Sequence, residues 1–160
     1  MKNKIPVFDL SLDSKDKKFA LDCLNTSYIG QGKYISLFEK EFSKFVKCKY
    51  GISTTSGTTG LHLACKILGI GKNDEVLVSA STNMACAFSV DYCGAIPIPI
   101  DIELDSWQMN VQEIEKRITK KTKAIMVVHL FGQAVDMDTV LKIAKKYKLK
   151  IIEDACLATG

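Results

Sequence analysis

The chain contains 160 residues, of which 47% are hydrophobic and 25% are charged, and its formal net charge is +4. This composition excludes a disordered or collagen-like chain, because enough apolar surface is available to offset the entropy lost on ordering. The charge excess is small and scattered, so it does not indicate nucleic acid or a membrane surface as a partner.

Targeting and metal-binding signals are missing from the sequence. No apolar run approaches the roughly 20 residues that a membrane-spanning helix needs. The opening MKNKIPVFDL lacks the apolar core of a secretory signal peptide. The six cysteines show no CxxC spacing, and the two histidines, His62 and His129, lie far apart. We therefore expect a cytoplasmic protein with reduced thiols and no metal site.

The first part of the chain has helical periodicity. Apolar residues recur at helical spacing over 12–25 and 33–48, which predicts two amphipathic helices. The stretch 27–32 between them contains two glycines and is typical of a loop. We interpret residues 1–49 as an N-terminal helical segment.

From residue 50 onward, short apolar runs alternate with helical patterns. The runs predict strands at 50–54, 75–79, 96–100, 123–128 and 150–153, with helices near 58–69, 83–93, 110–117 and 137–147. This alternation predicts an α/β fold with an open, mostly parallel sheet and helices on both faces. Because no helical pattern follows the last strand, we interpret residues 50–160 as part of a larger domain.

Ligands of open α/β sheets bind beyond the carboxyl ends of the strands. The turn TSGTTG at 55–60 leads directly into a predicted helix, whose free N–H groups and dipole would bind an anion such as phosphate. Gly57 would let the anion approach closely, and Ser56 or Thr58 could add a hydroxyl or simply cap the helix. The turn matches neither the Rossmann nor the P-loop glycine pattern, which disfavours a dehydrogenase and a P-loop ATPase.

Two further polar residues follow predicted strands. The carboxylate of Asp154 could pair with a cationic nitrogen of a ligand, or it could cap a following helix. Asn83 could cover a flat ligand or cap the helix after it. His129 ends a buried strand and is interpreted as a structural histidine, and the lysine clusters at helix ends as solvated faces rather than a nucleic-acid site.

Four collinear stretches together are more specific than any single motif. They read SGTTGLHLACKILGIGKNDEVLVSASTNMA, YCGAIPIPIDIELDSWQMN, ITKKTKAIMVVHLFGQAVDMD and KIIEDA. With them the chain resembles the N-terminal part of the DegT/DnrJ/EryC1/StrS family of sugar aminotransferases, which use pyridoxal 5′-phosphate (PLP) on an aspartate-aminotransferase-like fold of type I. The phrases DSWQMN and HLFGQAVDMD are most similar to the branch that contains the GDP-perosamine synthases.

The resemblance implies roles for five residues. The backbone of Thr58 and Thr59 would hold the PLP phosphate, Asn83 would lie against the pyridine ring, and Asp154 would pair with the pyridine nitrogen. Leu157 takes the place of a polar residue near the ring hydroxyl of the cofactor, and a leucine cannot donate or accept a hydrogen bond. The Schiff-base lysine of the family would lie beyond residue 160, so no catalytic residue is assigned within the chain.

The resemblance also implies a reaction and partners. The family transfers an amino group, usually from glutamate, to the keto carbon of a nucleotide-linked sugar, in the biosynthesis of cell-surface polysaccharide or lipopolysaccharide. Family members are homodimers, and the 27–32 loop with its neighbouring helices resembles the region that shapes the sugar-nucleotide pocket. The alternative is a truncated, catalytically inactive member that acts as a binding or partner module.

Overall fold

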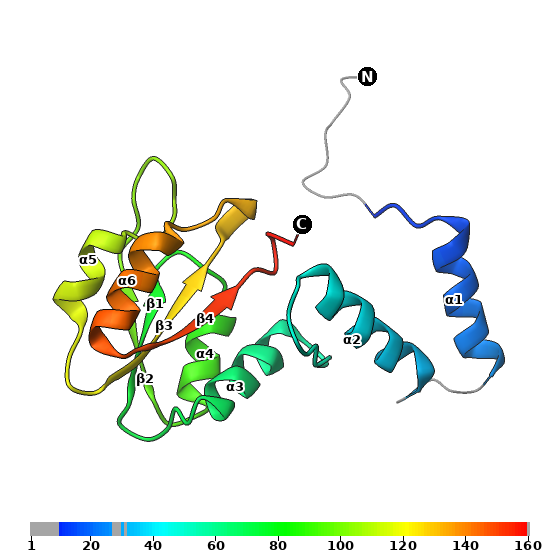
Figure 1. Ribbon diagram of the computed structural model, residues 1–160, viewed down its shortest axis with the longest axis horizontal. Coiled ribbons are helices and arrows are strands. Elements are labelled where there is room, and N and C mark those ends of the chain that lie inside the picture. Colours follow the sequence, from blue (N-terminus) through cyan, green and yellow to red (C-terminus); the bar gives the residue numbers. More distant parts are fainter. Residues whose placement is uncertain (1–9, 27–29, 31, 160) are drawn as a thin grey trace. The chain divides into compact units, whose positions relative to one another are not determined.

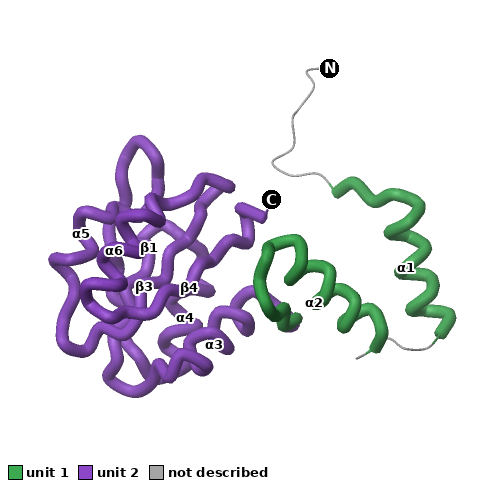
Figure 2. The backbone as a smooth tube through the Cα atoms, in the orientation of Figure 1, with its two compact units in different colours: residues 1–53 green, residues 54–160 purple. Residues whose placement is uncertain are grey.

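The structure is a computed structural model that describes residues 10–26, 30 and 32–159. The chain divides into two compact units, residues 1–53 and residues 54–160, which Figure 2 shows in different colours. Among the described residues, no helix is both long enough and apolar enough to cross a lipid bilayer.

The first unit contains the two predicted amphipathic helices, α1 (Ser14–Asn25) and α2 (Lys33–Phe45). Helix α1 begins at a capping box, in which Asp13 accepts hydrogen bonds from the first turn and the Asp16 side chain accepts from the backbone of Asp13. Neither helix contains a buried residue. Several large apolar side chains are therefore exposed in this unit, among them Phe19, Leu24, Phe38, Phe42 and Phe45.

The prediction of a strand at 50–54 is wrong, because no residue of this segment pairs with the sheet. Its polar groups bind α2 instead: the backbone N–H and the hydroxyl of Ser53 both donate to the Glu39 carboxylate, each at 2.8 Å. Gly51 approaches the same turn so closely that a Cβ atom there would lie 2.5 Å from the carbonyl oxygen of Glu39. The segment thus follows the helix of the first unit rather than a neighbouring strand.

The second unit is built on a parallel sheet whose strands lie where the apolar runs predict them. The strands are β1 (Glu75–Ser79), β2 (Ile96–Ile100), β3 (Thr122–Val128) and β4 (Lys150–Asp154), in the spatial order β2-β1-β3-β4 (Figure 1). Strand β2 carries Pro97 and Pro99, which lack the N–H that a central strand would need. Its place at the edge of the sheet accommodates both prolines.

Helices cover both faces of this sheet. Helices α3 (Gly57–Ile67) and α4 (Ala85–Asp91) pack on one face, where their buried side chains form one apolar cluster with Val76, Val78 and Met126. Helices α5 (Val111–Arg117) and α6 (Met137–Tyr147) form a second cluster on the other face with Leu77 and Ile125. Alternate residues of β1 and β3 therefore point to opposite faces, and the predicted α/β architecture is confirmed.

Candidate functional site

The carboxyl edge of the sheet brings together the segments that the sequence singles out. Helix α3 precedes β1 and packs against α4, which follows β1, so both helices begin at the edge where the strands end. Asp154 is the last residue of β4 and lies at the same edge. The predicted anion site and the predicted carboxylate thus belong to one region of the second unit.

Helix α3 begins with a capping box. Ser56 is the N-cap: its hydroxyl accepts the N–H of Thr59 at 3.2 Å, and the Thr59 hydroxyl accepts the N–H of Ser56 at 3.1 Å. Within the described residues, the N–H groups of Gly57 and Thr58 have no acceptor. A Cβ atom on Gly57 would meet nothing within 4 Å, so the chain leaves open space beside these two donors.

The Asp154 carboxylate is held by two donors, one on each oxygen. The backbone N–H of Cys156 donates to Oδ1 at 3.2 Å, and the thiol of Cys86 donates to Oδ2 at 3.4 Å. Between Ala155 and Thr159 the chain forms a turn rather than a helix. The carboxylate is half-buried and keeps further lone pairs for a ligand.

Asn83 and Leu157 lie at this edge in different settings. The Asn83 side chain is exposed, and its Oδ1 accepts the N–H of Ala85, the first residue of α4, at 3.0 Å. The Leu157 side chain is also exposed. Its carbonyl oxygen would lie 3.1 Å from a Cβ atom on Gly132, where φ is +84°, so a side chain at that position would be strained.

His129 is structural, as expected. Its ring is buried, Nδ1 accepts the N–H of Val135 at 3.2 Å, and Nε2 lies 3.2 Å from the Glu153 carboxylate. Because Nδ1 accepts, the ring proton of the neutral tautomer is on Nε2 and is donated to Glu153. The two ring nitrogens therefore form hydrogen bonds to the loop after β3 and to β4.

Sequence reasoning missed the two side chains that connect Asp154 to the start of α4. Cys86 is fully buried, and the Thr82 hydroxyl lies 3.4 Å from its sulfur. The pKa of the Cys86 thiol is raised to about 11, mainly by burial and in addition by the neighbouring Asp154 carboxylate, while the Thr82 hydroxyl acts in the opposite direction. In the sequence Cys86 is only a small apolar residue of a helical pattern, so nothing there indicates a contact across 68 positions.

The model of the DegT/DnrJ/EryC1/StrS aminotransferase family matches residues 11–160. The chain belongs to this family.

Related proteins of the DegT/DnrJ/EryC1/StrS family align with most of this chain, but the alignment covers only part of each relative. A GDP-perosamine synthase of Vibrio cholerae is 40% identical over 98% of the chain. A dTDP-3-amino-3,6-dideoxy-alpha-D-galactopyranose transaminase of Aneurinibacillus thermoaerophilus is 39% identical over 81%. The chain spans 43% and 36% of the lengths of these two relatives.

Solved structures show the same fold. NtdA of Bacillus subtilis, a structure with the bound cofactor PMP, superposes with a TM-score of 0.84 at 34% identity. The match covers 91% of this chain and 34% of NtdA. The expected α/β fold of the type I family is therefore confirmed for the described residues.

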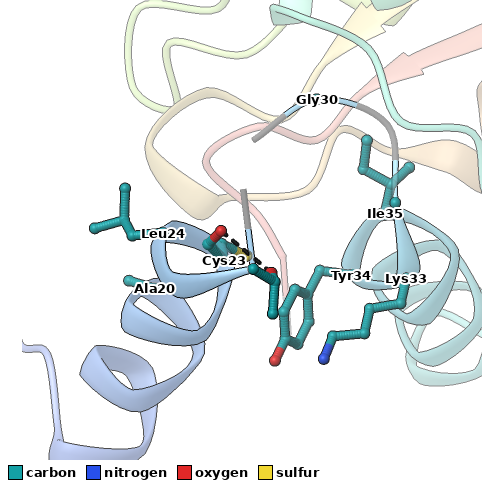
Figure 3. A pocket seen from close by; sticks show the side chains of 9 residues that line it. Ala20, Cys23, Leu24, Gly30, Lys33, Tyr34 and Ile35 are labelled. Atoms are coloured by element: carbon teal, nitrogen blue, oxygen red, sulfur yellow. Dashed lines mark hydrogen bonds between the residues drawn. The ribbon is translucent and has the colours of Figure 1, made fainter. Parts of the chain in front are cut away.

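The first unit contains a cavity of about 720 Å³ between α1 and α2 (Figure 3). Two of its lining residues, Lys33 and Tyr34, bind the Asp22 carboxylate, which pairs with the Lys33 ammonium and accepts from the Tyr34 hydroxyl, both at 2.6 Å. The Lys33 and Tyr34 hydrogen bonds lower the pKa of Asp22.

Of the 27–32 loop predicted to shape the sugar-nucleotide pocket, residues 27–29 and 31 lie outside the described residues. Among the described residues, no three His, Cys, Asp or Glu side chains form a metal-binding group.

The capping box of α3 gives a first prediction. Replacing Ser56 by alanine is expected to lower the free energy of unfolding by about 1 kcal/mol, because the N–H of Thr59 loses its acceptor. Urea denaturation measures the loss, and faster amide exchange at Thr59 localises it. Ser43→Ala is the control, since Ser43 lies inside α2 and its hydroxyl only bonds back to the Lys40 carbonyl. Equal stability of the two variants would contradict the prediction.

Proposed function

We propose that this chain is the N-terminal portion of a PLP-dependent aminotransferase that transfers an amino group from glutamate to a nucleotide-linked keto-deoxysugar. The observation that carries the proposal is that two kinds of group lie at the same edge of the sheet. They are two free N–H donors at the start of α3 and, at the end of β4, a carboxylate whose two oxygens each accept a hydrogen bond. In this proposal residues 1–49 are a helical segment and residues 50–160 are part of the PLP-binding large domain.

The start of α3 fits a phosphate group. The N–H groups of Gly57 and Thr58 are available, and the space beside Gly57 admits an anion at the positive end of the helix dipole. The N–H of Thr59 is engaged by Ser56, so Thr59 would contribute by exchanging this partner for a phosphate oxygen or through its hydroxyl. We therefore assign Thr58 and Thr59 to the phosphate of PLP.

Asp154 fits the pyridine nitrogen. Its carboxylate accepts one hydrogen bond on each oxygen, which fixes its plane and leaves lone pairs for a third donor. A carboxylate in this position keeps the proton on the ring nitrogen through charge and hydrogen bonding. PLP bound there supplies an electron sink for the bonds at the amino-bearing carbon.

Asn83 and Leu157 complete the assignment. We place Asn83 against a face of the ring, where it can keep its bond to the Ala85 N–H. Leu157 would offer an apolar contact only. The proton-transferring Schiff-base lysine is not assigned to any residue of the chain, so residues 1–160 bind and orient the cofactor in this proposal.

The substrate proposed is a GDP-linked keto-deoxysugar. The GDP-perosamine synthase matches 98% of the chain, and the dTDP-sugar transaminase matches 81%. We extend the proposal to a homodimer in the cytoplasm, where the six free cysteines would remain reduced. Sedimentation of the full-length protein tests the dimer.

The deciding experiment uses the full-length protein and has two stages. PLP is added first and its absorption spectrum is followed, and glutamate is then expected to convert the bound cofactor to its amino form. A GDP-linked keto-deoxysugar should return the spectrum and yield a GDP-linked amino sugar by mass spectrometry, whereas the dTDP-linked analogue should react more slowly. Absence of PLP binding would overturn the proposal. Binding without amino transfer would favour the alternative, an inactive binding module.

A further inference from the structure

Three segments meet at the Asp154 side chain. Cys86 comes from the first turn of α4, Thr82 from the loop after β1, and Asp154 from the end of β4. The Cys86 sulfur lies 3.4 Å from Oδ2 of Asp154 and 3.4 Å from the Thr82 hydroxyl. Cys86 is fully buried and therefore screened from water. The polar partners of its thiol are Asp154 and Thr82.

The direction of the hydrogen bonds follows from the protonation states. The pKa of Cys86 is raised to about 11, so the thiol keeps its proton at neutral pH. An ionised carboxylate only accepts, so the single thiol proton is donated to Asp154. The Thr82 hydroxyl must then donate to the sulfur, and the chain of donors runs from Thr82 through Cys86 to Asp154.

This chain constrains the carboxylate more than either donor would alone. The terminal torsion of an aspartate is broad and roughly two-fold, so an unrestrained carboxylate samples many orientations. Here Oδ1 is held by the N–H of Cys156 and Oδ2 by the thiol of Cys86, which fixes the torsion. A thiol is a weak donor, so it orients the group while leaving most of its charge for a ligand.

We propose that Cys86, supported by Thr82, is a positioning residue that orients the Asp154 carboxylate toward the ring nitrogen of the cofactor. The inference rests on the proposed function, but the contact between Cys86 and Asp154 exists without the cofactor. The two can therefore fail separately.

The first test is made without cofactor. The S–H stretching band of Cys86 is identified in the infrared spectrum of the full-length protein as the band lost in Cys86→Ala. Asp154→Asn is expected to move this band to higher frequency, because a neutral amide oxygen accepts more weakly than a carboxylate. Cys65→Ala is the matched control, since Cys65 is equally buried in the same apolar cluster and should leave the Cys86 band in place. A Cys86 band that does not move in Asp154→Asn overturns the inference.

The second test measures cofactor binding. Cys86→Ala is expected to raise the dissociation constant of PLP about fivefold, and Cys86→Ser to restore it to within about twofold, because a hydroxyl again donates to Asp154. The absorption maximum of bound PLP should shift in Cys86→Ala and be unchanged in Cys65→Ala, although both variants remove one buried sulfur. Identical behaviour of the two alanine variants would show a purely structural role. If the unmodified protein does not bind PLP, the proposed function fails, and the infrared test still decides whether Cys86 holds Asp154.

Discussion

Replacing Asp154 by alanine is expected to raise the dissociation constant of PLP about a hundredfold, the size of a lost charge-assisted hydrogen bond in a half-buried site. The carboxylate is the charged acceptor at the carboxyl end of β4 that its neighbours orient. Without it, nothing assigned in the chain holds a proton on the ring nitrogen. Absorption titration of the full-length protein with PLP measures the change.

Two further variants make this prediction specific. Asp154→Asn keeps the shape and the acceptor for Cys86 but removes the charge, so the dissociation constant of PLP should rise nearly as much as in the alanine variant. Asp101→Asn is the control: Asp101 follows β2, is exposed, and its carboxylate accepts the N–H of Ile102. Unchanged PLP affinity in Asp154→Ala would remove Asp154 from the cofactor site.

Truncating Ile125 to alanine is expected to lower the free energy of unfolding by about 3 to 4 kcal/mol. Ile125 is fully buried in β3, between Leu77 of β1 and Ile151 of β4 in register, and it packs under α5 and α6. The loss combines the apolar area returned to water with the cavity left in a rigid, close-packed sheet. Urea denaturation followed by far-ultraviolet circular dichroism measures it.

The control for Ile125 is Ile67→Ala. Ile67 ends α3 and is 72% exposed, so its truncation should change the free energy of unfolding by less than about 0.5 kcal/mol. If Ile125→Ala costs no more than Ile67→Ala, the face of the sheet under α5 and α6 is not close-packed as described.

The architecture of the second unit could be predicted because its signals are local. The apolar runs at 75–79 and 96–100 coincide with β1 and β2, and alternation of strands with helices of this length permits few arrangements other than a parallel sheet. The same holds for the start of α3, where the sequence TSGTTG carries its own capping residue and its own free N–H groups.

The first unit shows where local signals fail. The run at 50–54 has the composition of a strand, but a strand forms only where a neighbour offers its hydrogen-bonding edge. The Glu39 carboxylate of α2 accepts the Ser53 N–H instead, and Gly51 lies close to the backbone carbonyl of Glu39. A contact of this kind has no periodicity, so no sequence pattern indicates it.

The sequence by itself therefore determined the type of fold, the strand positions of the second unit, and the position of a glycine-containing helix start and of a carboxylate at strand ends, because these depend on neighbouring residues. Only the tertiary structure decided which oxygen of Asp154 meets which donor, and that Cys86 and Thr82 are among its neighbours. The physical reason is that 68 positions separate Cys86 from Asp154 in the sequence, and only the packing of α4 on the face of the sheet brings the thiol to the carboxylate at the end of β4.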